Sequence, residues 1–132
     1  SHHGNVPEDI MDFNRINTYR LGQLAYFLEK MRDTMEGDAS LLDKTAIIWG
    51  SPMADGNLHN HRRAPLLLLG RANGALEGGL HLRAPEGTPM ANAFVSLMRK
   101  IGHPETDTFG DSDGVFPLDL PDEAATAGSV SA

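Results

Sequence analysis

The chain has 132 residues, of which 40% are hydrophobic and 22% charged, a composition that suits one globular domain with its own core. The 18 acidic and 11 basic residues give a net charge of −7, which argues against a general nucleic-acid binder, since such proteins present a basic surface. The sequence has no cysteine, which excludes disulfides, thiol nucleophiles and cysteine-ligated zinc. The longest apolar run, residues 65–69, is too short to span a membrane.

A long helix is predicted from about Pro7 to Met35. Proline suits the first turn of a helix, and Glu8 and Asp9 place negative charge at the positive end of the helix dipole. Apolar residues recur along this segment at steps of three and four, which is typical of one helical face packed on a core. Gly37 follows, and a glycine in left-handed conformation is a common stop after the last turn.

Two strands and a second helix are predicted further along the chain. The continuous apolar runs 45–49 and 65–69 are each bounded by a glycine, a pattern typical of strands buried on both faces. The brief segment 81–83 is a candidate third strand, and a helix is predicted over residues 88–101. These elements predict an α/β layer, but two or three strands are few for an independent sheet, so we expect partner strands to be missing. Residues 121–132 are small or acidic and predict a disordered tail.

The polar segment between the two predicted strands carries the candidate site. Asp55, Asn57, His59 and His61 step by two residues, so an extended segment would point all four side chains the same way. Carboxylate, amide and imidazole groups that converge in this manner suit a divalent metal such as zinc, manganese or calcium. The alternative is a polar surface loop in which Asp55, Gly56 and Asn57 make a turn.

Two arginines follow these histidines directly. Arg62 and Arg63 could bind an anionic group through paired hydrogen bonds, or they could pair with acidic residues on the surface. The sequence alone leaves both interpretations open.

Several segments together resemble a bacterial family. The opening Ser1-His2-His3-Gly4 resembles the end of the histidine-serine-histidine motif of the HXXSHH family, a domain of unknown function. The segments LEKMRDTMEGDASLLD, TAIIWGSPMADGNLHNH, RRAPLLLLG, GGLHLRAPEGTPMANAF and FGDSDG are similar to the C-terminal third of that family. The resemblance covers about residues 1–120 and implies that this is the C-terminal part of an HXXSHH-like domain. The rest of the parent domain would then lie N-terminal to residue 1.

The HXXSHH family is similar in turn to the alkaline-phosphatase and sulfatase superfamily. That similarity implies a C-terminal fragment of an α/β/α sandwich, with Asp55 at the position of the metal-binding aspartate. Gly56 stands where the superfamily usually has histidine or asparagine, and the superfamily nucleophile would precede this chain. The implied metal ligands are Asp55, Asn57, His59, His61, His2 and His3, with His59 and His61 also as leaving-group acids and Arg62 and Arg63 as substrate-binding residues.

Two functions from different classes follow from this resemblance. One is a metal-dependent hydrolase of phosphate or sulfate esters, acting on a small anionic ester or on a sulfated or phosphorylated polymer. The other is a degenerate, non-catalytic binding protein of the same fold. A third interpretation is structural, with the histidines in a hydrogen-bond network that joins two loops. Members of the family are usually exported, which implies a periplasmic or cell-surface location.

Overall fold

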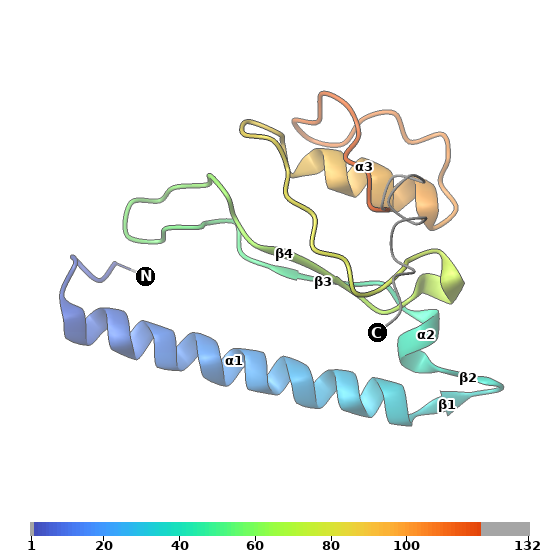
Figure 1. Ribbon diagram of the computed structural model, residues 1–132, viewed down its shortest axis with the longest axis horizontal. Helices are drawn as coiled ribbons and strands as arrows, with labels where there is room; N and C mark the ends of the chain where they lie inside the picture. The colour runs from blue at the N-terminus through green and yellow to red at the C-terminus, as the bar shows by residue number, and fades with distance from the viewer. Residues whose placement is uncertain (1, 120–132) are drawn as a thin grey trace, which may run out of the picture. The chain divides into compact units, whose positions relative to one another are not determined.

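The computed structural model describes residues 2–119 and is mixed α/β (Figure 1). The helices are α1 (Pro7–Asp33), α2 (Leu41–Lys44), η1 (Ala72–Gly74, a 3-10 turn) and α3 (Ala91–Lys100). The strands form two antiparallel pairs, β1 (Met35–Glu36) with β2 (Ala39–Ser40) and β3 (Ile47–Gly50) with β4 (Leu66–Leu69). The chain divides after Asn73 into two compact units, which are described separately. The predicted tail, residues 121–132, lies outside the described residues.

The long helix α1 forms as predicted but ends two residues early. Thr34 is already extended, and its backbone N–H still donates to the Lys30 carbonyl. The prediction that Gly37 stops this helix was wrong. Gly37 has a φ of +68° and lies between β1 and β2, where a left-handed residue lets the chain reverse within two residues.

The pair β3–β4 confirms the two predicted strands, with Ile47 opposite Leu69 and Gly50 opposite Leu66. The prediction that both faces are buried was wrong, since Ile48 is 49% exposed and Leu67 is 42% exposed. The helix α1 runs along one side of this pair (Figure 1). No other segment among residues 2–119 buries the side chains of Ile48 and Leu67, so the pair is not covered on both faces as predicted.

The junction between α2 and β4 is closely packed. Ser40 and Asp43 form a capping box at the start of α2, in which the Asp43 amide donates to Ser40 Oγ over 3.1 Å. Hydrogen bonds from the Ser40 hydroxyl and backbone lower the pKa of the Asp43 carboxyl. Gly70 has a φ of +86° and lies so close to the Thr45 carbonyl that no Cβ would fit.

The second unit is built around α3. Its buried side chains include Ala91, Ala93, Leu97 and Val95, and Val95 is fully buried. The helix is shorter than the predicted residues 88–101, because Ile101 already lies at the C-cap outside the regular helix. The segment after the helix packs back onto it, because Asn92 Nδ2 donates to Asp113 Oδ1 over 2.8 Å. No strand forms at residues 81–83.

Within the described residues, no helix combines the length and apolarity that a membrane crossing requires.

Candidate functional site

The loop between β3 and β4, residues 51–65, folds back on itself. Asp55 and Asn60 form an antiparallel bridge, in which the Asn60 amide donates to the Asp55 carbonyl over 2.9 Å. The Asp55 carboxylate closes the turn, since its Oδ1 accepts from the Asn57 amide at 2.9 Å and the Leu58 amide at 3.2 Å. This is the Asx turn that an Asp-Gly-Asn sequence favours.

The predicted extended arrangement of the four polar residues was therefore wrong. His59 has a φ of +50°, which reverses the chain direction between Asn57 and His61. A left-handed residue cannot belong to a continuous strand, so the two-residue spacing no longer points the side chains the same way. The alternative interpretation, a turn at Asp55, Gly56 and Asn57, is the one that the structure shows.

The N-terminal arm, residues 2–6, docks on this loop. Asn57 Oδ1 accepts from two arm amides, His3 N at 3.1 Å and Gly4 N at 2.9 Å. The His2 ring stacks on the His59 ring, with centroids 4.7 Å apart and an interplanar angle of 29°. The Nε2 atoms of these two rings are 2.9 Å apart, a hydrogen-bond distance in which one nitrogen donates and the other accepts. The structure thus joins two imidazoles that are 57 positions apart.

The other predicted histidine ligands have local partners. His61 Nδ1 lies 2.8 Å from the Pro52 carbonyl, so Nδ1 carries the proton in this contact and Nε2 is left as the acceptor of a neutral ring. His3 Nδ1 accepts from the Asn5 amide at 3.1 Å. Both contacts orient a ring within its own segment, and neither brings it to the His2–His59 pair.

Arg62 and Arg63 end the loop with exposed side chains. The Arg62 amide donates to Asn60 Oδ1 over 2.8 Å, and Arg63 has a φ of +57°. Within residues 2–119 neither guanidinium takes part in an ion pair. Both arginines therefore keep their charge available beside the loop.

The spacing of the His2–His59 pair is close to that of two ligands on one metal ion. Two imidazoles bound to one tetrahedral zinc place their nitrogens about 3.3 Å apart, given Zn–N bonds of about 2.0–2.1 Å. The Nε2 atoms of His2 and His59 at 2.9 Å need only a small separation to reach this distance. Among the described residues, however, no group of three histidine, aspartate or glutamate side chains lies close enough to hold a metal ion. A metal at this pair would therefore have only two ligands among the described residues, and its remaining positions would be left to water or to another group.

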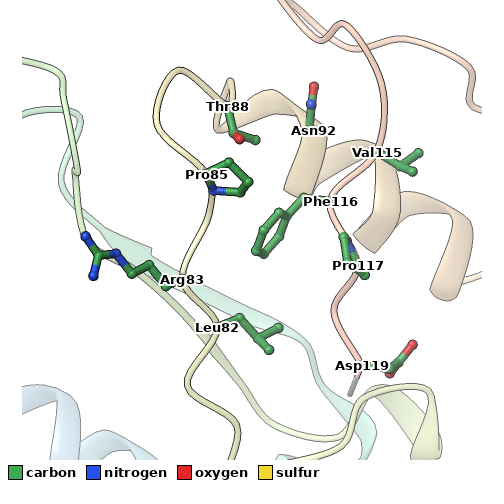
Figure 2. Close-up of a pocket in the computed structure, with 9 residues that line it drawn as sticks. All are labelled: Leu82, Arg83, Pro85, Thr88, Asn92, Val115, Phe116, Pro117 and Asp119. Atoms are coloured by element: carbon green, nitrogen blue, oxygen red, sulfur yellow. The ribbon is translucent and has the colours of Figure 1, made fainter. Parts of the chain in front are cut away.

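A groove in the second unit was not predicted from the sequence (Figure 2). It encloses about 400 Å³, with Leu82, Arg83 and Pro85 on one wall and Phe116 and Pro117 on the other. The sequence gives no specific signal for this groove, and residues 81–83 on its wall were predicted only as a candidate third strand.

Comparisons with family models, with curated proteins and with solved structures find no match to this chain. The resemblance to the HXXSHH family therefore stays a prediction from the residues quoted above.

Proposed function

We propose that this chain binds a divalent metal through His2 and His59 and forms part of a hydrolase of phosphate or sulfate esters. The observation that carries the proposal is the imidazole pair, with its Nε2 atoms 2.9 Å apart. Neutral imidazole nitrogens are the commonest protein ligands of zinc, and both rings are exposed to an incoming ion. A bound metal would supply Lewis-acid polarisation of the ester oxygen.

The other residues of the loop would position the two imidazoles and bind the ester. Asp55 and Asn57 hold the turn and the N-terminal arm through backbone amides, which fixes His2 against His59. Arg62 and Arg63 would hold the anionic ester through hydrogen bonds to its oxygens. When protonated, His61 would donate a proton from Nε2 to the leaving group, since its Nδ1 already faces the Pro52 carbonyl.

A second candidate function is a non-catalytic binding protein of the same fold. The Asp55 carboxylate and the Asn57 side-chain oxygen accept hydrogen bonds from backbone amides. Only the two imidazoles are then left as metal ligands, and this favours the non-catalytic function. In this case Arg62 and Arg63 would bind a sulfated or phosphorylated polymer without hydrolysis.

The resemblance to the HXXSHH family extends this proposal to the fold and the location of a larger protein. The chain would complete an alkaline-phosphatase-like α/β/α sandwich together with a part that precedes residue 1, and that part would carry the nucleophile. The whole protein would be exported to the periplasm or the cell surface. The exposed face of β3 and β4 is consistent with strands or helices supplied from elsewhere.

The test is zinc binding by the chain without a histidine tag, measured by calorimetry and by metal analysis after dialysis. We expect zinc binding in the wild type and its loss in both His2→Ala and His59→Ala. His103→Ala is the matched control, because His103 is an exposed histidine of the second unit, with Glu105 as its neighbour at 3.6 Å. Zinc binding that persists in both site variants, or its absence in the wild type, would refute the metal site.

Catalysis needs a separate measurement on the full-length parent protein. Release of nitrophenol from p-nitrophenyl phosphate or sulfate, lost in His59→Ala, would support the hydrolase. Retained zinc and heparin binding without any ester hydrolysis would support the binding protein instead.

A further inference from the structure

The helix α1 carries an outer stripe of exposed side chains, made of Ile16, Tyr19, Gln23 and Tyr26. Ile16 is 49% exposed, Tyr19 68% and Tyr26 58%. The side of α1 that packs within the first unit is a different one, with the buried or half-buried residues Phe13, Asn17, Leu24, Leu28 and Met31. The outer stripe advances by alternate steps of three and four residues, as the a and d positions of a coiled coil do, so it has the pattern of a surface that pairs with another helix.

Two opposite charges lie at each end of the outer stripe. Asp12 and Arg15 lie at its start and pair with each other at 2.8 Å. Glu29 and Lys30 lie at its end, and neither forms an ion pair among residues 2–119. Lys30 Nζ lies 5.3 Å from the centroid of the Tyr26 ring, which holds its positive charge beside the stripe.

These charges distinguish between the two directions in which a second copy of the helix could pair. In a parallel pair Asp12 would face Asp12 of the second copy, and Lys30 would face Lys30. In an antiparallel pair centred near residue 21, Asp12 would face Lys30 of the second copy, and Arg15 would lie beside Glu29. Charge complementarity therefore favours an antiparallel second copy of this chain.

The same antiparallel register brings the apolar residues of the two stripes together. Ile16 would pack against Tyr26 of the second copy and Tyr19 against Gln23, and the two-fold axis would repeat each contact. Phe27 is 46% exposed beside the stripe and lines an apolar groove between α1 and β3. The apolar surface thus continues from the stripe toward β3, which widens the area that a second copy would cover.

We propose that two copies of this chain associate through the outer stripes of their α1 helices, antiparallel and related by a two-fold axis. Asp12 and Lys30 form an ion pair at each end of the interface. Beyond these pairs Asp9 comes near Asp33 of the second copy, and Arg32 Nε, 2.9 Å from Asp33 Oδ1, offsets that charge. The interface uses none of the residues proposed to bind metal or ester and does not depend on the proposed function.

The test is sedimentation of the intact chain at concentrations from about 10 μM to 1 mM, since an interface of this short length corresponds to a Kd in the micromolar range. We expect the mass to rise with concentration toward twice the chain mass of 14.3 kDa. Lys30→Glu should weaken association about tenfold or more, because both ion pairs become repulsive. Asp12→Lys should have the same effect, and the double variant Asp12→Lys with Lys30→Glu should restore association.

Two exposed positions separate the outer stripe from the rest of the helix surface. Tyr19→Lys places a charge at the centre of the stripe and should abolish the dimer. Leu21→Lys is the matched control, because Leu21 is 51% exposed on the opposite side of α1 and should leave association unchanged. Circular dichroism of each variant checks that the chain remains folded.

A spin label on Glu8→Cys measures the direction of pairing, since the chain has no cysteine of its own. In the antiparallel register residue 8 lies level with residue 34 of the second copy, so the two labels should be about 40 Å apart. In a parallel pair they would be within about 20 Å. Three results would each overturn the proposal: a monomeric mass at every concentration, a double variant that stays as weak as the single ones, or labels within about 20 Å of each other.

Discussion

Removal of the Asn57 side-chain oxygen should release the N-terminal arm from the loop. In Asn57→Ala the amides of His3 and Gly4 lose their shared acceptor, at 3.1 Å and 2.9 Å respectively. A hydrogen bond of this kind contributes about 0.5–1.5 kcal/mol, and these two are at most partly buried, so the arm should lose about 1–2 kcal/mol of docking free energy. That free energy corresponds to a roughly 5- to 30-fold shift toward the undocked arm.

The assay is NMR on the intact chain. The nuclear Overhauser contacts between the rings of His2 and His59 should weaken in Asn57→Ala, and amide exchange at His3 and Gly4 should accelerate by the same factor. The matched control is Asn57→Asp, which keeps an oxygen acceptor at the same place and should retain the docked arm. Unchanged ring contacts in Asn57→Ala would refute the reasoning, since His2 would then be held against His59 by something other than Asn57.

Two further predictions concern the first unit. Gly70→Ala should lower the free energy of unfolding by about 3 kcal/mol in chemical denaturation, because its Cβ would lie 2.1 Å from the Thr45 carbonyl oxygen at a φ of +86°. Gly22→Ala, inside α1 with open space around the Cβ, should instead stabilise by about 0.5–1 kcal/mol, and a similar loss in both variants would contradict this account. Ser40→Ala should raise the pKa of Asp43 in an NMR titration, because it removes the Ser40 hydroxyl hydrogen bond that contributes most to the lowered pKa, while the hydrogen bond from the Ser40 backbone N–H remains. The wild-type capping box stabilises the folded chain above the ordinary Asp43 pKa of 3.8, and this stabilisation is lost as the pH falls through the lowered folded-state pKa. Ser40→Ala should therefore make the free energy of unfolding depend less on pH in that acidic range. An unchanged pH dependence would contradict this prediction.

Local signals were sufficient to predict the main elements. The helix α1 follows from Pro7 and its acidic first turn, and the strands β3 and β4 follow from two continuous apolar runs. The end of α1 was misjudged because a left-handed glycine serves a hairpin as well as a helix stop, and Gly37 does the former. The sequence pattern does not show that the helix already ends at Asp33. Thr34 ends it by adopting an extended backbone, three residues before the glycine.

The site shows where a pattern in sequence is ambiguous. A two-residue spacing of polar side chains has the same appearance in a strand and in a loop, and the Asp55 turn decides for the loop. The contact between His2 and His59 joins positions too distant for any local pattern to pair them. Asn57, predicted as a metal ligand, instead accepts from the arm amides, because unsatisfied backbone donors compete for the same oxygen.

We expect the imidazole pair to depend on the packing of α1 as well as on its own contacts. The helix has 27 residues, which corresponds to about 40 Å, and it carries the N-terminal arm at one end. A rotation of about 1° around its far end would move the arm by about 0.7 Å, enough to change the 2.9 Å separation of the two Nε2 atoms appreciably.

Leu24 is the buried side chain that packs this helix, and Leu24→Ala should cost about 3 kcal/mol and loosen that packing. We therefore expect weaker ring contacts between His2 and His59 in Leu24→Ala at temperatures where the chain stays folded, although position 24 lies about 25 Å along the helix from the arm. Leu21→Ala is the control, because Leu21 is 51% exposed on the same helix. Ring contacts of wild-type strength in folded Leu24→Ala would show that the arm and the loop hold the two imidazoles together without help from the helix.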